Sequence, residues 1–345
     1  MGIYANNAFA SAIKINQPIV PSGSLSITAG GRYNVYSYSS INVSVEDLLE
    51  ARLFGNGVSL NEYTDMSASI ISPGAFAAQR VSIINMPAVT FVGQYACANN
   101  SSLTSINLPA CEYIDTRAFY SCSKLLEANL PKCSVLSTSV FAGCSKLVSV
   151  SLPMCTSLGT STFMSCSALE NVNIPNCSFF SDYMFGYCYK LSNIYLPACT
   201  SFSRNVFYFC SELRSANFPE CTYIGYNCFY SCSQLSSINI PKCSLIGQGC
   251  FQYCYSLTSI SLPACTSFST SAFNKCYNLL SVYLNVSSVP SLANVNVFNS
   301  TPISNYTTST GGIYGSIYVP TSLYSSFIAA TNWATYSARI VSMNF

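Results

Sequence analysis

The sequence contains no histidine and few charged residues of either sign. Its 345 residues include 14 basic and 12 acidic residues, so 8% of the chain is charged, against about a quarter in an average soluble domain. Without histidine, Ser–His and Cys–His nucleophile systems and histidine-ligated metals are excluded. Because the charges nearly cancel, nothing suggests electrostatic binding to nucleic acid or to an anionic membrane.

Long apolar runs are missing as well. No stretch approaches the roughly 20 apolar residues that span a bilayer, so no membrane span is expected. The amino terminus, MGIYANNAFASAIKINQPIVPSG, has neither a basic segment nor a continuous apolar one, and no conventional secretory signal is expected there. Tyrosine (25) and phenylalanine (21) are abundant, whereas tryptophan occurs once. Because only 8% of the residues are charged, Ser, Thr, Asn and Tyr hydroxyls and amides must cover much of the surface.

A 22-residue repeat organises most of the chain. Its prolines fall at positions 87, 109, 131, 153, 175, 197, 219, 241 and 263. When each proline is counted as position 0, position 10 is Phe from Phe119 to Phe273 and position 16 is Leu from Leu103 to Leu279. The consensus is P-x-C-x-x-(I/L/F)-x-x-x-x-F-x-x-C-x-x-L-x-x-(I/V)-x-L.

This period suits one coil of a solenoid, because it is too short for two packed helices with their turns. The segment L-x-x-(I/V)-x-L predicts a short strand, and the proline after it predicts a turn. Equivalent residues then stack from coil to coil around one core, with parallel strands about 4.8 Å apart. The fold class predicted is a β-rich solenoid of about ten coils over residues 65–285.

The repeats resemble the BspA-type leucine-rich repeats of bacterial surface and phage-encoded proteins. The segments IGYNCFYSCSQLSSINIP (224–241) and FSTSAFNKCYNLLSVYL (268–284) keep the order of that family: Ile-Gly, Ala-Phe, a small residue, Cys, then Leu-x-Ser-Ile before the proline. Eight units carry the motif without a gap. The departure is a second cysteine at position 2, where the family has an aliphatic residue.

Two terminal segments flank the repeats. Residues 1–64 are predicted to hold a β-hairpin over 22–45, around a Gly-Gly turn, and a capping helix over 44–54. The hairpin resembles short β-modules of phage structural and cell-surface proteins. Residues 286–345 are predicted to form an α+β cap, with a strand, a helix starting near Thr321 and a closing segment. This end resembles the terminal module that often follows such repeats.

Sixteen of the 19 cysteines recur every eleven residues from Cys111 to Cys276. Eleven residues are half a coil, so positions 2 and 13 lie on opposite walls, and each set stacks into a ladder. Three interpretations compete: disulfides, a metal or cluster site, and thiols buried as small apolar core residues. The third is favoured, because stacked side chains point in parallel, C-x-x-C is absent and free cysteine is commonly buried. Such thiols indicate synthesis in a reducing cytoplasm.

Nothing in the sequence predicts catalysis, a cofactor or a bound metal. The acidic residues are scattered over different repeat positions, whereas glycoside hydrolysis needs two facing carboxylates. Glu112 and Asp115, the closest pair within a coil, are expected in a solvated turn. No glycine-rich phosphate loop follows a predicted strand.

A binding surface is the remaining possibility. If positions 19 and 21 face the core, position 20 points outward. This outward column contains Asn107, Asn129, Asn173, Tyr195, Asn217, Asn239 and Tyr283, together with Ser151 and Ser261. Tyrosines crowd other exposed columns: Tyr187, Tyr189, Tyr208, Tyr230, Tyr253 and Tyr255, and also Tyr120 and Tyr277. These side chains suit a neutral cell-surface glycan or a protein partner, or they merely solvate the coils.

The sequence therefore predicts a non-enzymatic recognition or adhesion protein. With no secretory signal expected, the favoured setting is a phage tail or other host-binding component, located in the virion or on an extracellular surface. A bacterial cell-surface adhesin is an alternative. So is an assembly protein whose solenoid packs against itself or against other virion proteins.

Overall fold

A computed structural model of the chain describes residues 4–5, 24–27, 33–34, 38–43, 60–304 and 314–345, with side chains from Glu62 onward. They form a parallel β-solenoid of about 12 turns with a small C-terminal helical cap, which confirms the predicted fold class. The chain divides into two compact units, residues 1–169 and 170–345. The division into segments 1–64, 65–285 and 286–345 stays a prediction.

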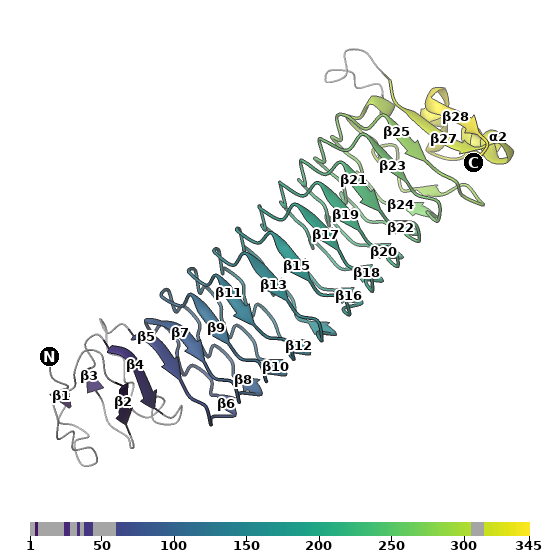
Figure 1. Cartoon of the computed structure of the whole chain (residues 1–345). Coiled ribbons are helices and arrows are strands. Elements are labelled where there is room, and N and C mark those ends of the chain that lie inside the picture. Colours follow the sequence, from purple (N-terminus) through teal and green to yellow (C-terminus); the bar gives the residue numbers. More distant parts are fainter. Residues whose placement is uncertain (1–3, 6–23, 28–32, 35–37, 44–59, 305–313) are drawn as a thin grey trace. The chain divides into compact units, whose positions relative to one another are not determined.

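The first unit contains two parallel sheets, which run along different sides of the coils (Figure 1). One has the order β11-β9-β7-β5-β4-β2, made of β2 (Ser24–Ile27), β4 (Tyr38–Val43), β5 (Leu60–Thr64), β7 (Val81–Asn85), β9 (Ser105–Asn107) and β11 (Glu127–Asn129). The other has the order β14-β12-β10-β8-β6, made of β6 (Ile70–Ile71), β8 (Phe91–Val92), β10 (Tyr113–Ile114), β12 (Val135–Leu136) and β14 (Ser157–Leu158). Strand β13 (Ser149–Ser151) follows at the repeat position of β11.

The second unit repeats this arrangement. Its short strands form the sheet β16-β18-β20-β22-β24-β26, with β16 (Phe179–Phe180), β18 (Ser201–Phe202), β20 (Tyr223–Ile224), β22 (Leu245–Ile246), β24 (Ser267–Phe268) and β26 (Ser291–Leu292). Its longer strands are β15 (Asn171–Asn173), β17 (Asn193–Tyr195), β19 (Ser215–Asn217), β21 (Ser237–Asn239), β23 (Ser259–Ser261) and β25 (Ser281–Tyr283). Strand pairing joins β17-β19-β21 and, with the C-terminal strands, β23-β25-β27-β28.

Each regular coil thus carries two strands where the sequence predicts one. The longer strand covers positions 18–20, as predicted, and Ile106 faces the core between half-buried neighbours. The second strand covers positions 4 and 5, where Ile114 is fully buried. A strand of two residues is too short to show an alternating apolar pattern, so this second sheet could not be predicted from the sequence.

The predicted β-hairpin over residues 22–45 is wrong. Strand β2 pairs with β4 in parallel, with Ser24 opposite Ser40, whereas a hairpin pairs its strands antiparallel. The reason is that β4 also pairs in parallel with β5, so these strands continue the stack of coils. A separate antiparallel pair joins β1 (Tyr4–Ala5) to β3 (Tyr33–Asn34). The helix predicted over 44–54 lies outside the described residues.

The other side of each coil is a run of tight turns at positions 7 to 14, which we call the turn ribbon. Its amides alternate between two kinds of acceptor. In the coil of Pro109, the N–H groups of Arg117, Phe119 and Ser121 donate to carbonyls of the next coil at 2.8–3.0 Å. Those of Ala118, Tyr120 and Cys122 donate to the carbonyl three residues back at 3.1–3.3 Å. The ribbon therefore satisfies its own backbone and joins successive coils.

This geometry places two residues of each ribbon in the left-handed region. At position 8, Arg117 has φ 55° and Asn205 has φ 59°, and at position 12 Ser121 has φ 56° and Gly143 has φ 79°. Only glycine adopts this conformation at no steric cost, and bulky side chains rarely do. The turn ribbon thus favours small residues at position 12.

The core is built from columns of identical residues. In the first unit, the Phe119 and Phe141 rings stack with centroids 5.3 Å apart. In the second, the rings from Phe185 to Phe298 stack at 5.2–5.4 Å between neighbours, spaced one repeat apart as far as Phe273. These rings are fully buried, and such stacked pairs add about 0.5–1.5 kcal/mol each beyond area burial.

The cysteines lie in the same core, and none of the 19 forms a disulfide. At position 13, Cys144 Sγ donates to the Phe119 carbonyl at 3.2 Å, and Cys232 Sγ donates to the Phe207 carbonyl at 3.1 Å. Each of these bonds joins a thiol to the phenylalanine of the preceding coil. At position 2 the contacts are longer, as from Cys111 Sγ to the Tyr113 carbonyl at 3.5 Å. The packed-thiol interpretation is confirmed, and the thiols also cross-link coils as weak donors.

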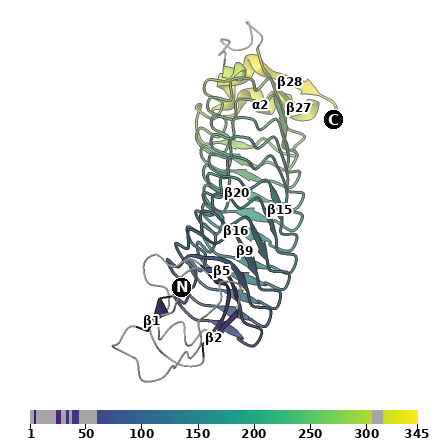
Figure 2. The same ribbon diagram turned by 60° about the vertical axis from the view of Figure 1, so that its left-hand side comes forward.

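The C-terminal end closes the core of the second unit (Figure 2). After η2 (Pro302–Ser304) come β27 (Ser316–Pro320), η3 (Thr321–Leu323), α2 (Tyr324–Ala329), η4 (Trp333–Arg339) and β28 (Ile340–Met343). This agrees with the predicted strand, helix near Thr321 and closing segment. The single tryptophan, Trp333, is buried against Phe268, Phe298 and Phe327. Its Nε1 donates to the Pro290 carbonyl at 2.6 Å.

Thiol titration tests the buried ladders. Burial raises the pKa of Cys122, Cys166 and Cys228 to about 12, and reaction requires an accessible thiolate. Native reduced protein is expected to be almost unreactive toward a thiol reagent at pH 8, and denatured protein to titrate all 19 thiols. A count several thiols short after reduction and desalting would contradict the absence of disulfides.

Gly225 provides a test of coil spacing. A Cβ at Gly225 would lie 2.0 Å from the Ser203 carbonyl oxygen of the preceding coil. Gly225→Ala is therefore expected to lower the free energy of unfolding by about 1–3 kcal/mol, measured by urea denaturation. Ser269→Ala, at the same repeat position, is the control and is expected to change it by under about 0.5 kcal/mol. Equal effects would contradict the close approach.

Candidate functional site

The predicted binding residues fall into two groups on different sides of the coil. Asn107, Asn129, Asn173, Tyr195, Asn217, Asn239 and Tyr283 lie on the longer strands. Tyr187, Tyr189, Tyr208, Tyr230, Tyr253 and Tyr255 lie on the turn ribbon of the second unit. Within a coil, the ribbon ends at position 14 and the longer strand begins at position 18, so the two groups occupy successive segments of the coil.

On the strand side, asparagines mainly bond one another. In the first unit, Asn107 Nδ2 donates to Asn85 Oδ1 at 2.8 Å and Asn129 Nδ2 donates to Asn107 Oδ1 at 2.6 Å. In the second, Asn239 Nδ2 donates to Asn217 Oδ1 at 2.8 Å. A ligand would have to compete with these amide ladders. Tyr195 is 56% exposed, whereas Tyr283 stacks on Tyr318 at 4.8 Å.

On the turn-ribbon side, the tyrosines form one continuous aromatic patch. Its members are Tyr183, Tyr187, Tyr189, Tyr208, Phe209, Tyr230, Tyr253, Tyr255 and Tyr277. Tyr208 and Tyr230 stack with centroids 5.0 Å apart, and Tyr230 meets Tyr253 edge-on at 5.1 Å. Tyr189 and Tyr255 are the most exposed, at 43% and 39%. The rings hold one another in place and leave hydroxyl groups and ring edges at the surface.

The list of tyrosines predicted from sequence omits Phe209 and Tyr183. Phe209 lies 4.8 Å from Tyr208 between ring centroids, and Tyr183 lies 6.0 Å from it. Comparing each ribbon position from coil to coil would have found both, because Phe209 replaces a small residue at position 12 and Tyr183 replaces the serine that Ser139 and Ser161 provide at position 8.

Aromatic residues stand at position 12 only in the second unit. At position 12 the first unit has Ser121, Gly143 and Ser165. The second unit has Tyr187 with φ 63°, Phe209 with φ 59° and Tyr253 with φ 65°, together with Ser231 and Lys275. Bulky residues in the left-handed region cost about 1 kcal/mol or more each. The fold forms with serine or glycine here, so the aromatic side chains are not required to build the ribbon.

The phenols of the patch lie in different electrostatic environments. Lys275 Nζ donates to the Tyr253 hydroxyl at 3.1 Å and lies 4.8 Å from the ring centroid. This hydrogen bond lowers the pKa of Tyr253. Burial, followed by a hydrogen bond with Tyr253, raises the pKa of Tyr230 to about 12. The pKa values of these two neighbouring phenols are therefore shifted in opposite directions.

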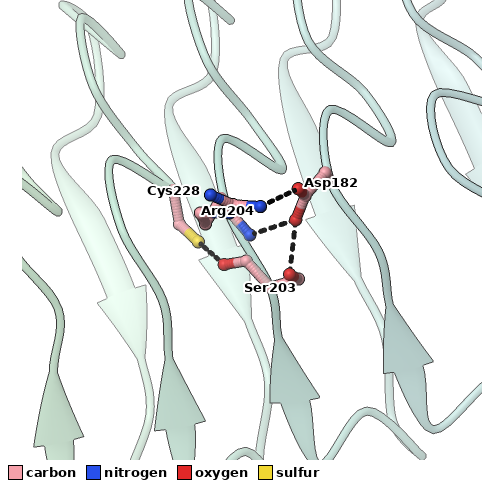
Figure 3. Close-up of polar contacts among 4 residues, drawn as sticks. All are labelled: Asp182, Ser203, Arg204 and Cys228. Carbon is pink, nitrogen blue, oxygen red and sulfur yellow. Dashed lines mark hydrogen bonds and ion pairs between the residues drawn. The ribbon is translucent and has the colours of Figure 1, made fainter.

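Asp182, which precedes Tyr183 in the sequence, forms an ion pair with Arg204 (Figure 3). Arg204 Nη2 lies 3.1 Å from Asp182 Oδ2, and the Arg204 amide donates to Asp182 Oδ1 at 2.9 Å. The Ser203 hydroxyl also donates to Asp182 Oδ1, and Cys228 Sγ donates to the Ser203 carbonyl at 3.0 Å. Burial alone raises the pKa of Asp182, but the hydrogen bonds from Ser203 and Arg204 outweigh it and the pKa is lowered.

Two other kinds of site are absent from the described residues. In this part of the chain, no group of three or more cysteine or carboxylate side chains is placed to hold a metal ion. Nor does any helix there combine the length and apolar character needed to cross a membrane.

A profile of the BspA type leucine rich repeat region matches residues 3–126, 69–192 and 178–304. The chain belongs to this family. No curated protein matches the chain, so the BspA-type assignment rests on the repeats themselves. It agrees with the resemblance seen in the sequence.

Several solved structures are similar to this BspA-type chain. A leucine-rich repeat protein from Bacteroides ovatus ATCC 8483 has TM-score 0.51 and 19% identity, covering 100% of this chain and 99% of that one. The pneumococcal vaccine antigen PcpA has TM-score 0.47 and 14% identity, covering 94% and 90%. A leucine-rich cell surface protein from Faecalibacterium prausnitzii A2-165 has TM-score 0.37 and 17% identity, covering 93% and 91%. The first of these supports the fold.

The Asp182 carboxylate predicts a pH-dependent contribution to stability. Because its folded-state pKa is lowered, the contribution is present above the unfolded pKa of about 3.9 and is lost as pH falls through the folded-state value. Asp182→Asn is expected to lower the free energy of unfolding at pH 7 by about 1 kcal/mol, and the difference from wild type should vanish near pH 2. Glu220→Gln, in an exposed pair with Lys242, is the control. A difference independent of pH would contradict this assignment.

Proposed function

We propose that the chain is a non-enzymatic recognition protein of a bacterial cell surface, and that it binds its ligand on the aromatic patch. The observation that carries this proposal is the placement of Tyr187, Phe209 and Tyr253 at left-handed positions. Backbone strain that the fold does not need is a feature of functional sites. The equivalent serines and glycine of the first unit show that the fold does not need it here.

The chemical character of the patch supports binding rather than catalysis. Tyrosine supplies rigid contact area with few torsions to restrict, so it binds at low entropic cost. The neighbouring carboxylates Asp182 and Glu212 are engaged with Arg204 and Lys190.

The cell-surface setting is favoured over the phage tail. BspA-type repeats resemble those of bacterial surface proteins, and neither the fold nor the comparisons give support to a virion role. Both partner classes that the sequence predicts, a protein and a cell-surface glycan, suit an aromatic surface. Assembly with a second copy of the chain is the alternative function, and the binding test must distinguish it from recognition of a different ligand.

Binding by the patch can be tested on a mixed array of immobilised glycans and proteins. Beads coated with wild-type protein are expected to bind at least one class of spot. The double variant Tyr189→Ser/Tyr255→Ser is expected to lower that binding at least tenfold, because both exposed rings are lost. Tyr195→Ser, which removes a 56% exposed ring from the strand side, should bind like wild type.

Two results would overturn the proposal. One is equal binding by wild type and the double variant. The other is a wild-type dimer, measured by light scattering, that the double variant converts to a monomer, because the patch would then be an assembly interface. Labelling of intact source cells with a specific antibody tests the location, and signal confined to lysed cells would contradict it.

A further inference from the structure

We propose that the ligand of the aromatic patch is an uncharged, linear glycan that lies along the stack of coils. This inference rests on the proposed function and goes beyond it by naming the class of ligand and its direction. Three properties of the patch lead to it: a repeated pair of tyrosines, charges that are already engaged, and the residues that stand between the rings.

The patch contains the same tyrosine pair twice. Tyr187 and Tyr189 lie at positions 12 and 14 of one coil, with ring centroids 6.3 Å apart and planes at 73°. Tyr253 and Tyr255 lie at the same positions three coils later, with centroids 6.1 Å apart and planes at 85°. With coils about 4.8 Å apart, the two pairs are separated by about 14 Å. A polymer with a repeating unit can present the same chemical group to both pairs.

Rings connect the two pairs without a break. Tyr187 contacts Tyr208 at 5.5 Å, Tyr208 stacks on Tyr230 at 5.0 Å, and Tyr230 contacts Tyr253 at 5.1 Å. This path follows the stack of coils rather than the circumference of one coil. A linear ligand laid along the stack would therefore meet aromatic surface over its whole length.

The charges beside the patch are engaged within the protein. Lys190 follows Tyr189 in the sequence, and its Nζ lies 2.6 Å from Glu212 Oε1. Asp182 precedes Tyr183 and pairs with Arg204. Lys275 donates to the Tyr253 hydroxyl. An anionic ligand would compete with Glu212 and Asp182 for Lys190 and Arg204, whereas an uncharged ligand would leave both ion pairs intact.

The residues between the rings favour a sugar over a protein. At positions 11, 12 and 14 of the coils from Pro175 onward, the non-aromatic residues are glycine, serine, glutamine, asparagine and one lysine. Protein interfaces usually centre on anchors held in dry pockets, and no aliphatic side chain stands at these positions. A sugar ring has an apolar C–H face and a rim of hydroxyls, which suits aromatic rings interleaved with hydroxyl and amide groups.

Calorimetric titration of the full chain with uncharged oligosaccharides tests this inference. The probes are β-linked glucose, xylose and mannose chains and α-linked glucose chains, from disaccharide to octasaccharide, with oligogalacturonate as the charged comparison. At least one uncharged series is expected to bind, with affinity that rises with length until both tyrosine pairs are bridged and then levels off. The oligogalacturonates are expected to bind at least tenfold more weakly.

Matched variants locate the site. Tyr189→Ser and Tyr255→Ser are each expected to weaken binding of the longest chain about five- to tenfold and to abolish the length dependence, because one of two equivalent pairs is removed. Tyr195→Ser is expected to have no effect. Thermal unfolding of each variant in the absence of sugar confirms that it is folded.

The remaining outcomes overturn the inference, and they separate it from the proposed function. If protein spots on the mixed array bind through Tyr189 and Tyr255 while every uncharged oligosaccharide fails, the ligand is a protein and the recognition role stands. If oligogalacturonate binds as tightly as the uncharged chains, the argument from charge is wrong. If affinity does not depend on chain length, the two pairs do not act together.

Discussion

In coil after coil, the amides at positions 8, 10 and 12 donate to carbonyls of the next coil, as those of Phe229 and Ser231 do at 2.8 Å. The remaining ribbon amides close tight turns within their own coil. This alternation lets the irregular side of the coil stack as regularly as the two sheets. It holds Phe229 over Phe251 with centroids 5.3 Å apart, and it brings the Cys254 thiol within 3.2 Å of the Phe229 carbonyl. The core columns therefore depend on the ribbon.

The cysteines follow from the same constraint. Position 13 needs a small apolar side chain that also reaches a carbonyl of the preceding coil, and a thiol meets both requirements. Asn100 occupies this position in an early coil, and its buried Nδ2 has no hydrogen-bond partner. An amide is thus a poorer fit than a thiol. The eleven-residue spacing marks the two walls of one coil.

Much of the fold could be predicted from the sequence because strict repetition makes each core column visible. Phe119, Leu125 and Cys122 are fully buried, as the columns indicate. Two features could not be predicted. The strand at Tyr113–Ile114 is too short to show a period, and the left-handed conformation of Tyr187 and Tyr253 runs against the preference of bulky residues.

The candidate site was predicted only in part. The tyrosines from Tyr187 to Tyr255 do gather, but the asparagines of the outward column lie on another side of the coil and bond one another. An exposed column of residues does not by itself tell whether its side chains are available to bind a ligand. The amide groups of Asn239 and Asn217, for example, already form a hydrogen bond with each other. The comparison of equivalent positions in the two units is more informative, since the fold is the same in both.

The most direct test of the link between strain and binding replaces the three left-handed aromatics at position 12 by residues that the first unit uses there: Tyr187→Ser, Phe209→Gly and Tyr253→Ser in one chain. The two quantities to measure are the free energy of unfolding and the binding to the mixed array. If the aromatics are present for binding, stability stays within about 1 kcal/mol of wild type or rises, while binding is lost. A large loss of stability with binding intact would show that the aromatic patch is structural.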